Sequence, residues 1–195
     1  GMRYVLTRRG PLSLSVNQAG GFVRTRSDLD RPNIQLYFSP VSYTKAAVGE
    51  KPMMNPDPFP AYLLGVSNCR VKSEGQINIT CNDPNVAPAI DTNYLAHEDD
   101  IQDLLEGVKL IRKLSQTEQL QAITVDEMRP GVECKTDAQL VDDIRNNADT
   151  IFHPCGTCRM GPNPQDDVVN SELKVHGLRA LRVVDASIFP NILCG

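Results

Sequence analysis

The chain has 195 residues, of which 41% are hydrophobic and 23% charged, as in ordinary globular proteins rather than disordered, fibrous or membrane ones. Its 20 Lys and Arg residues are outnumbered by 24 Asp and Glu residues, so no basic excess is available for nucleic-acid phosphates, and no nucleic-acid partner is expected. No apolar stretch reaches the roughly 20 residues that span a bilayer, and residues 1–10 contain no signal-peptide core. We therefore expect a soluble, cytoplasmic protein.

The N-terminal half predicts an antiparallel sheet. Residues 3–25 are basic and rich in Gly, which indicates loop and strand rather than helix. Residues 33–39 (NIQLYFS) alternate apolar and polar side chains, the period of a half-buried strand. Residues 61–67 (AYLLGVS) and 76–80 (QINIT) predict further strands, and the proline-rich residues 41–60 predict a surface loop. We expect the strands near 34, 62 and 77 to form one sheet.

Two helices are predicted after these strands. Between residues 99 and 114, apolar side chains recur every three or four positions, with acidic residues at the start and basic residues at the end. Thr136, followed three positions later by Gln139, forms a capping-box pattern that predicts a helix over residues 137–146. Together these elements predict an α+β fold in which helices cover an antiparallel sheet.

The sequence changes character after Asp149. A turn-rich run comes first, and residues 178–185 (LRALRVVD) then form an apolar segment that predicts a strand covered on both faces, as in a parallel sheet. No neighbouring strand for it is evident. The sequence also contains no GxGxxG or GxxxxGKS/T motif, so no cradle for nucleotide phosphates is predicted within it.

The densest group of reactive residue types begins at His153, in the run HPCGTC. By spacing alone, this histidine is a hydrogen-bonded loop residue, a general base or a metal ligand. Zinc would need His153, Cys155, Cys158 and a fourth ligand from elsewhere in the fold. A zinc-deaminase signature fails because Asp99, not Glu, stands two places after His97. A redox CxxC is a further reading, although all six cysteines are expected to be free thiols.

Several segments match known motifs in their order along the chain. They are residues 7–21 (TRRGPLSLSVNQAGG), 86–95 (VAPAIDTNYL), 153–161 (HPCGTCRMG), 168–169 (VV), 173–177 (LKVHG), 181–187 (LRVVDAS) and Pro190. This set resembles the C-terminal region of the glucose-methanol-choline (GMC) flavoprotein oxidoreductases, and most closely the choline-dehydrogenase-like members. The resemblance covers nearly the whole chain.

The resemblance implies FAD-dependent oxidation of a small primary alcohol to an aldehyde. His153 matches the family's catalytic histidine, which takes the hydroxyl proton while hydride passes to N5 of the flavin. Asp185 and Ala186 match a cofactor-binding segment that lies near the flavin and its phosphates. Cys155 matches no required position and Cys158 a structural one, so no metal site is expected.

The resemblance also implies two parts of unequal size. Residues 1–148 would form a substrate-binding domain, and residues 149–195 would hold the catalytic-histidine loop and the last strand of an FAD-binding domain. The GxGxxG unit is missing from this sequence, and the family's second active-site residue would follow Gly195. We therefore expect a truncated fragment that is inactive without an N-terminal FAD domain as its partner. Self-association and peripheral membrane attachment of the parent protein stay open.

An alternative hypothesis is that the protein has the fold of the family but does not catalyse alcohol oxidation. The chain would then be a non-catalytic binding or interaction module that retains the substrate-domain fold. Such a module would be a stable monomer that binds a ligand without redox activity.

Overall fold

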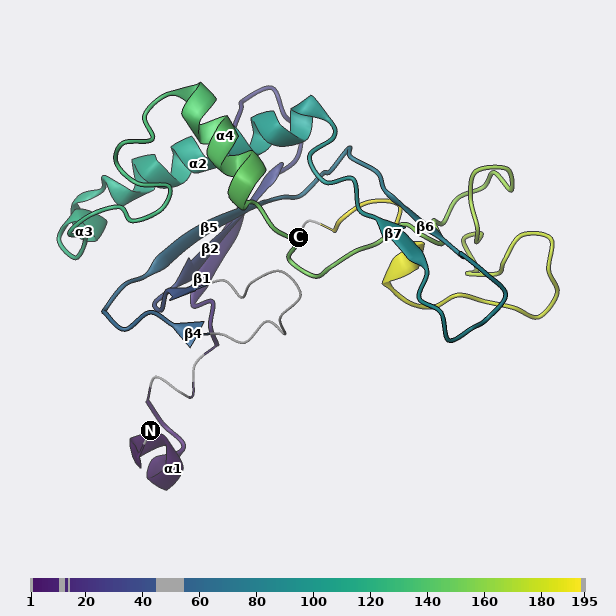
Figure 1. Cartoon of the computed structure of the whole chain (residues 1–195), viewed down its shortest axis with the longest axis horizontal. Helices are drawn as coiled ribbons and strands as arrows, with labels where there is room; N and C mark the ends of the chain where they lie inside the picture. Colours follow the sequence, from purple (N-terminus) through teal and green to yellow (C-terminus); the bar gives the residue numbers. More distant parts are fainter. Residues whose placement is uncertain (1, 11–12, 14, 45–54, 194–195) are drawn as a thin grey trace.

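The computed structural model describes residues 2–10, 13, 15–44 and 55–193. The helices are α1 (Met2–Thr7), α2 (Glu98–Ser115), α3 (Glu118–Gln121), α4 (Asp137–Asn147) and the short 3-10 turn η2 (Ala186–Ile188). The strands are β1 (Ala19–Val23), β2 (Ile34–Ser39), β3 (Tyr43–Thr44), β4 (Asn55–Pro56), β5 (Leu63–Asn68), β6 (Gln76–Asn78) and β7 (Ala89–Asp91). The fold is α+β, as predicted (Figure 1). No described helix is long and apolar enough to cross a bilayer.

The main sheet has three antiparallel strands in the order β1-β2-β5. Tyr37 in the central strand stands opposite Gly20 on one side and Gly65 on the other. A Cβ atom at Gly20 would lie 2.4 Å from the backbone oxygen of Leu36, so a glycine is needed where β1 approaches β2. The expected strands near 34 and 62 are thus confirmed.

Helix α2 packs on one face of this sheet. It makes its closest approach at Gly107, where an added Cβ would lie 3.3 Å from Ile34 and 3.4 Å from Val66. Helix α4 packs against α2, and the two helices share a buried cluster that includes Leu105 and Leu140. Among the described helices, α2 alone contacts the sheet, so the prediction that both helices cover it was wrong for α4.

Both long helices begin where the sequence predicted. The hydroxyl of Thr136 accepts from the backbone N–H of Gln139 at 3.2 Å, and the side chain of Gln139 accepts from the N–H of Thr136 at 2.9 Å, which confirms the capping box. Helix α2 is capped by His97, whose Nδ1 accepts from the N–H of Asp99 at 3.2 Å. His97 therefore has a defined structural role as the N-cap of α2.

Two expectations about strands and loops were wrong in the N-terminal half. The strand near 77 does not join the main sheet, because β6 pairs with β7 and the third strand of the sheet is β1. Residues 2–7 form a helix rather than loop or strand, since the glycines and prolines that break helices begin only at Gly10. Within the predicted surface loop, β3 pairs with β4, while residues 45–54 lie outside the described residues.

The predicted strand over residues 178–185 does not form. Leu181 and Val184 are 48% and 71% exposed, and Val183 donates its N–H to the nearby carbonyl of Leu173 at 3.2 Å. Among the described residues, the segment pairs only through one antiparallel bridge between Arg182 and Lys174, and no described strand extends this pairing into a sheet. Figure 1 shows the main sheet and long helices at one end of the molecule, with β6, β7 and the loop-rich residues 150–193 toward the other.

Candidate functional site

His153 lies on an extended segment between α4 and the turn-rich run. Its side chain is exposed, and within the described part of the chain its imidazole has no hydrogen-bond or ion-pair partner. The preceding residue, Phe152, has φ of 60°, a left-handed conformation that is unusual for an aromatic residue. Pro154 follows and restricts His153 to extended backbone. The imidazole is therefore free to meet a group from outside the described residues.

The loop that carries His153 is held against the turn η2. The carbonyl of Ser187 accepts from the N–H groups of Gly156 at 3.1 Å and Cys158 at 3.0 Å. The next carbonyl, that of Ile188, accepts from the N–H of Met160 at 2.9 Å. The structure thus brings together two segments that the sequence assigned separately, the histidine loop and the predicted cofactor-binding segment.

Asp185 is the N-cap of η2. Its Oδ1 accepts from the N–H of Ser187 at 2.8 Å and from the hydroxyl of Ser187 at 2.5 Å. These bonds, the side-chain bond first, hold the pKa of Asp185 below its ordinary value, because they favour the ionised carboxylate. Ala186 is exposed at the first position of the turn. The predicted cofactor contacts of Asp185 and Ala186 stay predictions.

Sequence reasoning missed Ser187, although a signal for it was present. An Asp followed two positions later by Ser is a common turn pattern, because the carboxylate can accept from both the backbone and the hydroxyl of the later residue. In this chain Ser187, the later residue of the pattern, also supplies the carbonyl that accepts from the histidine loop.

The glycine that ends the HPCGTCRMG run has a steric role. A Cβ on Gly161 would lie 2.1 Å from Oδ2 of Asp167, whose carboxylate accepts from Nε of Arg159 and from the N–H of Asn163, each at 3.0 Å. Nε2 of His176 lies 3.0 Å from the carbonyl oxygen of Gly161. His176 therefore has a structural role.

The cysteines of the described residues provide no disulfide framework. Cys81, Cys134, Cys155 and Cys158 are free thiols, as predicted, whereas Cys194 lies outside the described residues. Burial raises the pKa of the Cys155 thiol, which keeps it protonated and weakens it as a nucleophile or metal ligand. Within the described ranges, no three His, Cys, Asp or Glu side chains form a group suited to a metal ion.

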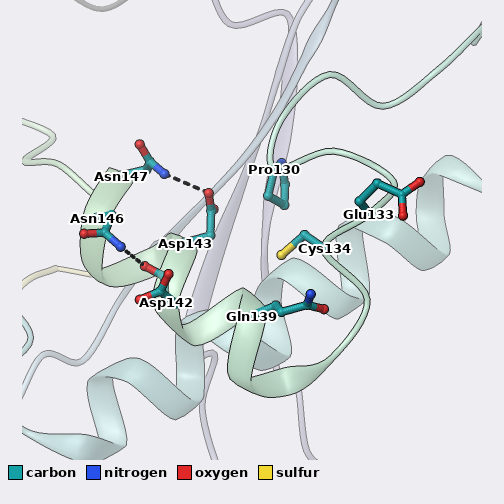
Figure 2. A pocket seen from close by; sticks show the side chains of 8 residues that line it. All are labelled: Pro130, Glu133, Cys134, Gln139, Asp142, Asp143, Asn146 and Asn147. Atoms are coloured by element: carbon teal, nitrogen blue, oxygen red, sulfur yellow. Dashed lines mark hydrogen bonds between the residues drawn. The ribbon is translucent and has the colours of Figure 1, made fainter.

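Two hollows lie in the helical half of the molecule. Figure 2 shows the smaller one, of about 370 Å³, between α4 and the loop that carries Pro130 and Cys134. The larger one, of about 600 Å³, lies between β5, α2 and residues 123–130. His153 lines neither of them, so the exposed histidine and the hollows belong to different parts of the surface.

Comparison with known proteins places these motifs in a family. Residues 71–195 match the sequence model described as GMC oxidoreductase. The chain is 41% identical over 181 residues to the oxygen-dependent choline dehydrogenase of Escherichia coli (strain K12), an alignment that covers 91% of this chain and 31% of that protein. The chain belongs to the GMC oxidoreductase family. Within it, the chain corresponds to the C-terminal region and is choline-dehydrogenase-like.

Solved structures support the same assignment. Pyridoxine 4-oxidase from Mesorbium loti is similar with a TM-score of 0.77 and 27% identity, over 93% of this chain and 35% of that one. An FAD-dependent oxidoreductase from Chaetomium thermophilum is similar with a TM-score of 0.64 and 30% identity, over 69% of this chain and 23% of that one. The chain spans about a third of the length of the choline dehydrogenase and of pyridoxine 4-oxidase.

Proposed function

We propose that this chain is the substrate-binding part of an FAD-dependent enzyme that oxidises a primary alcohol to an aldehyde. The observation that carries the proposal is the exposed His153, on a loop bonded to the η2 turn, in a chain of the GMC family. In this proposal, residues 1–148 form a substrate-binding domain, and residues 149–195 belong with an FAD-binding domain.

The residues around η2 fit the edge of a flavin. Ala186 is small and exposed, so a planar ring can approach its backbone closely. Leu181 and Val184 expose apolar side chains that a covering domain would bury. The sequence has no glycine-rich cradle, so residues outside it would bind the diphosphate of FAD. When bound, FAD would supply the acceptor for the hydride that leaves the carbinol carbon.

His153 would take the proton of the substrate hydroxyl. A neutral imidazole can accept this proton near neutral pH, provided that a ring nitrogen reaches hydrogen-bond distance of the hydroxyl oxygen. The exposed ring has no partner in the described chain that competes for this contact. The backbone of His153 would be held by Pro154 and by the hydrogen bond from the N–H of Gly156 to the carbonyl of Ser187 in η2.

The face of the sheet opposite α2 would form a wall of the substrate site. On this face the hydroxyls of Tyr37 and Ser67 are hydrogen bonded to each other at 2.9 Å. Phe22 adds an aromatic ring that is 39% exposed. Such a surface combines apolar contact with neutral hydrogen-bonding groups, which suits a small alcohol.

A chimeric enzyme tests the proposal. The chain would replace the matching region of the Escherichia coli choline dehydrogenase, with the residues of that protein retained on both sides. We expect the chimera to keep FAD through gel filtration, and small primary alcohols to bleach its visible flavin absorbance under anaerobic conditions. The methyl ether of each alcohol, which has no hydroxyl proton, is the matched control. A chimera that keeps FAD but is reduced by no alcohol would contradict the proposal and favour a non-catalytic binding module.

A further inference from the structure

The histidine loop depends on the orientation of one peptide group. The carbonyl of Ser187 accepts two hydrogen bonds from the loop, at 3.1 Å from Gly156 and 3.0 Å from Cys158. A carbonyl oxygen can accept twice only when both donors lie near its lone-pair directions. A rotation of the peptide between Ser187 and Ile188 would therefore weaken both bonds at once.

Asp185 sets the orientation of that peptide. Its Oδ1 accepts from both the N–H and the hydroxyl of Ser187, and its carbonyl accepts from the N–H of Ile188 at 3.3 Å. The next bond of the turn runs from the N–H of Phe189 to the carbonyl of Ala186 at 3.2 Å. A three-residue turn with so few internal bonds relies strongly on its cap.

The connection from this turn to the histidine is short and stiff. Only Pro154 and Cys155 separate His153 from Gly156, which has φ of 92° and is held by Ser187. The ring of Pro154 fixes its own φ, and the Cys155 side chain is partly buried. Because only two residues separate them, we expect a displacement of Gly156 to change the position of His153.

We propose that Asp185 and Ser187 are positioning residues that hold the His153 loop in its reactive geometry. This inference rests on the proposed function, since it assigns to His153 the role of the base. In this inference the Asp185 carboxylate holds the histidine loop in place, in addition to any contact that it makes with a cofactor.

The first test measures hydrogen exchange in the chain itself. Loss of an N-cap carboxylate in Asp185→Ala should speed exchange of the Gly156 and Cys158 amides by about fivefold. Asp185→Asn keeps an oxygen that caps equally well, so it should stay within about twofold of the unmodified chain. The matched control is Asp83→Ala, which removes the same kind of turn cap, with bonds of 2.9 Å to Asn85, without touching the loop.

The second test measures flavin reduction by a primary alcohol in the chimera described above. Asp185→Ala should slow the reduction at least tenfold, while Asp185→Asn restores most of the rate and Asp83→Ala leaves it unchanged. Unchanged exchange at Gly156 and Cys158 in Asp185→Ala would overturn the inference. Faster exchange with an unchanged rate would also overturn it, while leaving the proposed function intact. If His153→Gln does not slow the chimera, the proposed function fails, and the inference fails with it.

Discussion

Replacing Gly161 with alanine should destabilise the loop-rich residues 150–193, here called the lobe, which include the histidine loop. The added Cβ would lie 2.1 Å from Oδ2 and 2.3 Å from Cγ of Asp167, well inside any contact distance. One of the two groups must move. Because Asp167 is bonded on both sides, to Arg159 and to the backbone of Asn163, its displacement breaks both bonds.

The energetic cost follows from the burial of the groups involved. The Asp167 side chain is 9% exposed, so it stays largely desolvated after losing its donors, whereas Arg159 is 38% exposed and regains water. Hydrogen bonds to charged groups contribute about 1.5–3 kcal/mol each, and solvent offsets part of the Arg159 bond. We estimate a loss of about 2–3 kcal/mol, which corresponds to roughly 30- to 150-fold faster opening of the lobe.

Native-state hydrogen exchange measures this opening. The amides of Met160 and His176 report on it, because they donate to Ile188 and Val168 within the lobe. The control is Gly21→Ala, since an added Cβ at Gly21 has no atom within 4 Å. Equal exchange rates in the Gly161 and Gly21 variants would refute the steric argument.

Three further predictions concern other contacts. Asp100→Ala should lower the free energy of unfolding by about 3 kcal/mol in urea titrations. The reason is the loss of a buried carboxylate that accepts from two backbone amides and a hydroxyl. Asp100→Asn should lower the free energy of unfolding by less. The pKa of Asp185 lies below its ordinary value of 3.8, so the bond to Ser187 contributes stability above that pH and loses it as the pH falls through the lower folded value. The chemical shift of the Ser187 amide should therefore titrate with a midpoint below pH 3.8. Iodoacetamide should alkylate the partly buried Cys155 more slowly than the exposed Cys81, as measured by mass spectrometry, since burial raises the pKa of the Cys155 thiol.

Each of these has a clear contrary result. A urea midpoint for Asp100→Ala equal to that of the unmodified chain would contradict the buried-acceptor argument. A shift of the Ser187 amide centred at or above pH 3.8 would mean that the carboxylate is not stabilised by its turn. Alkylation of Cys155 as fast as that of Cys81 would show that its burial does not protect it.

Local signals in the sequence predicted local structure well. The helix over residues 99–114 and the capping box at Thr136 could be predicted because the residues that define them lie within one or two helical turns. The strand at residues 33–39 could likewise be predicted from its alternation of apolar and polar side chains. The pairing partners of the strands could not be predicted, because β1 joins the sheet through Gly20 and Gly21, and glycine is depleted in strands.

The sequence motifs identified the segments of the site but did not predict how they contact each other. The run at His153 identified the loop, and the pattern at Asp185 identified a second segment, but nothing in the spacing indicated that Ser187 would join them. The segment at residues 181–184 failed as a strand because its apolar pattern depends on a covering surface that the described chain does not provide.

The role of His153 as the base in alcohol oxidation can be tested directly. The most direct measurement compares the anaerobic rate of flavin reduction by a primary alcohol in the chimera with that in its His153→Gln variant. We expect the rate to fall by about 10²- to 10⁴-fold with FAD still bound. His97→Asn, which preserves the cap of α2, should leave the rate unchanged. A His153→Gln rate within about threefold of the unmodified chimera would contradict the account, because general-base catalysis contributes far more than that.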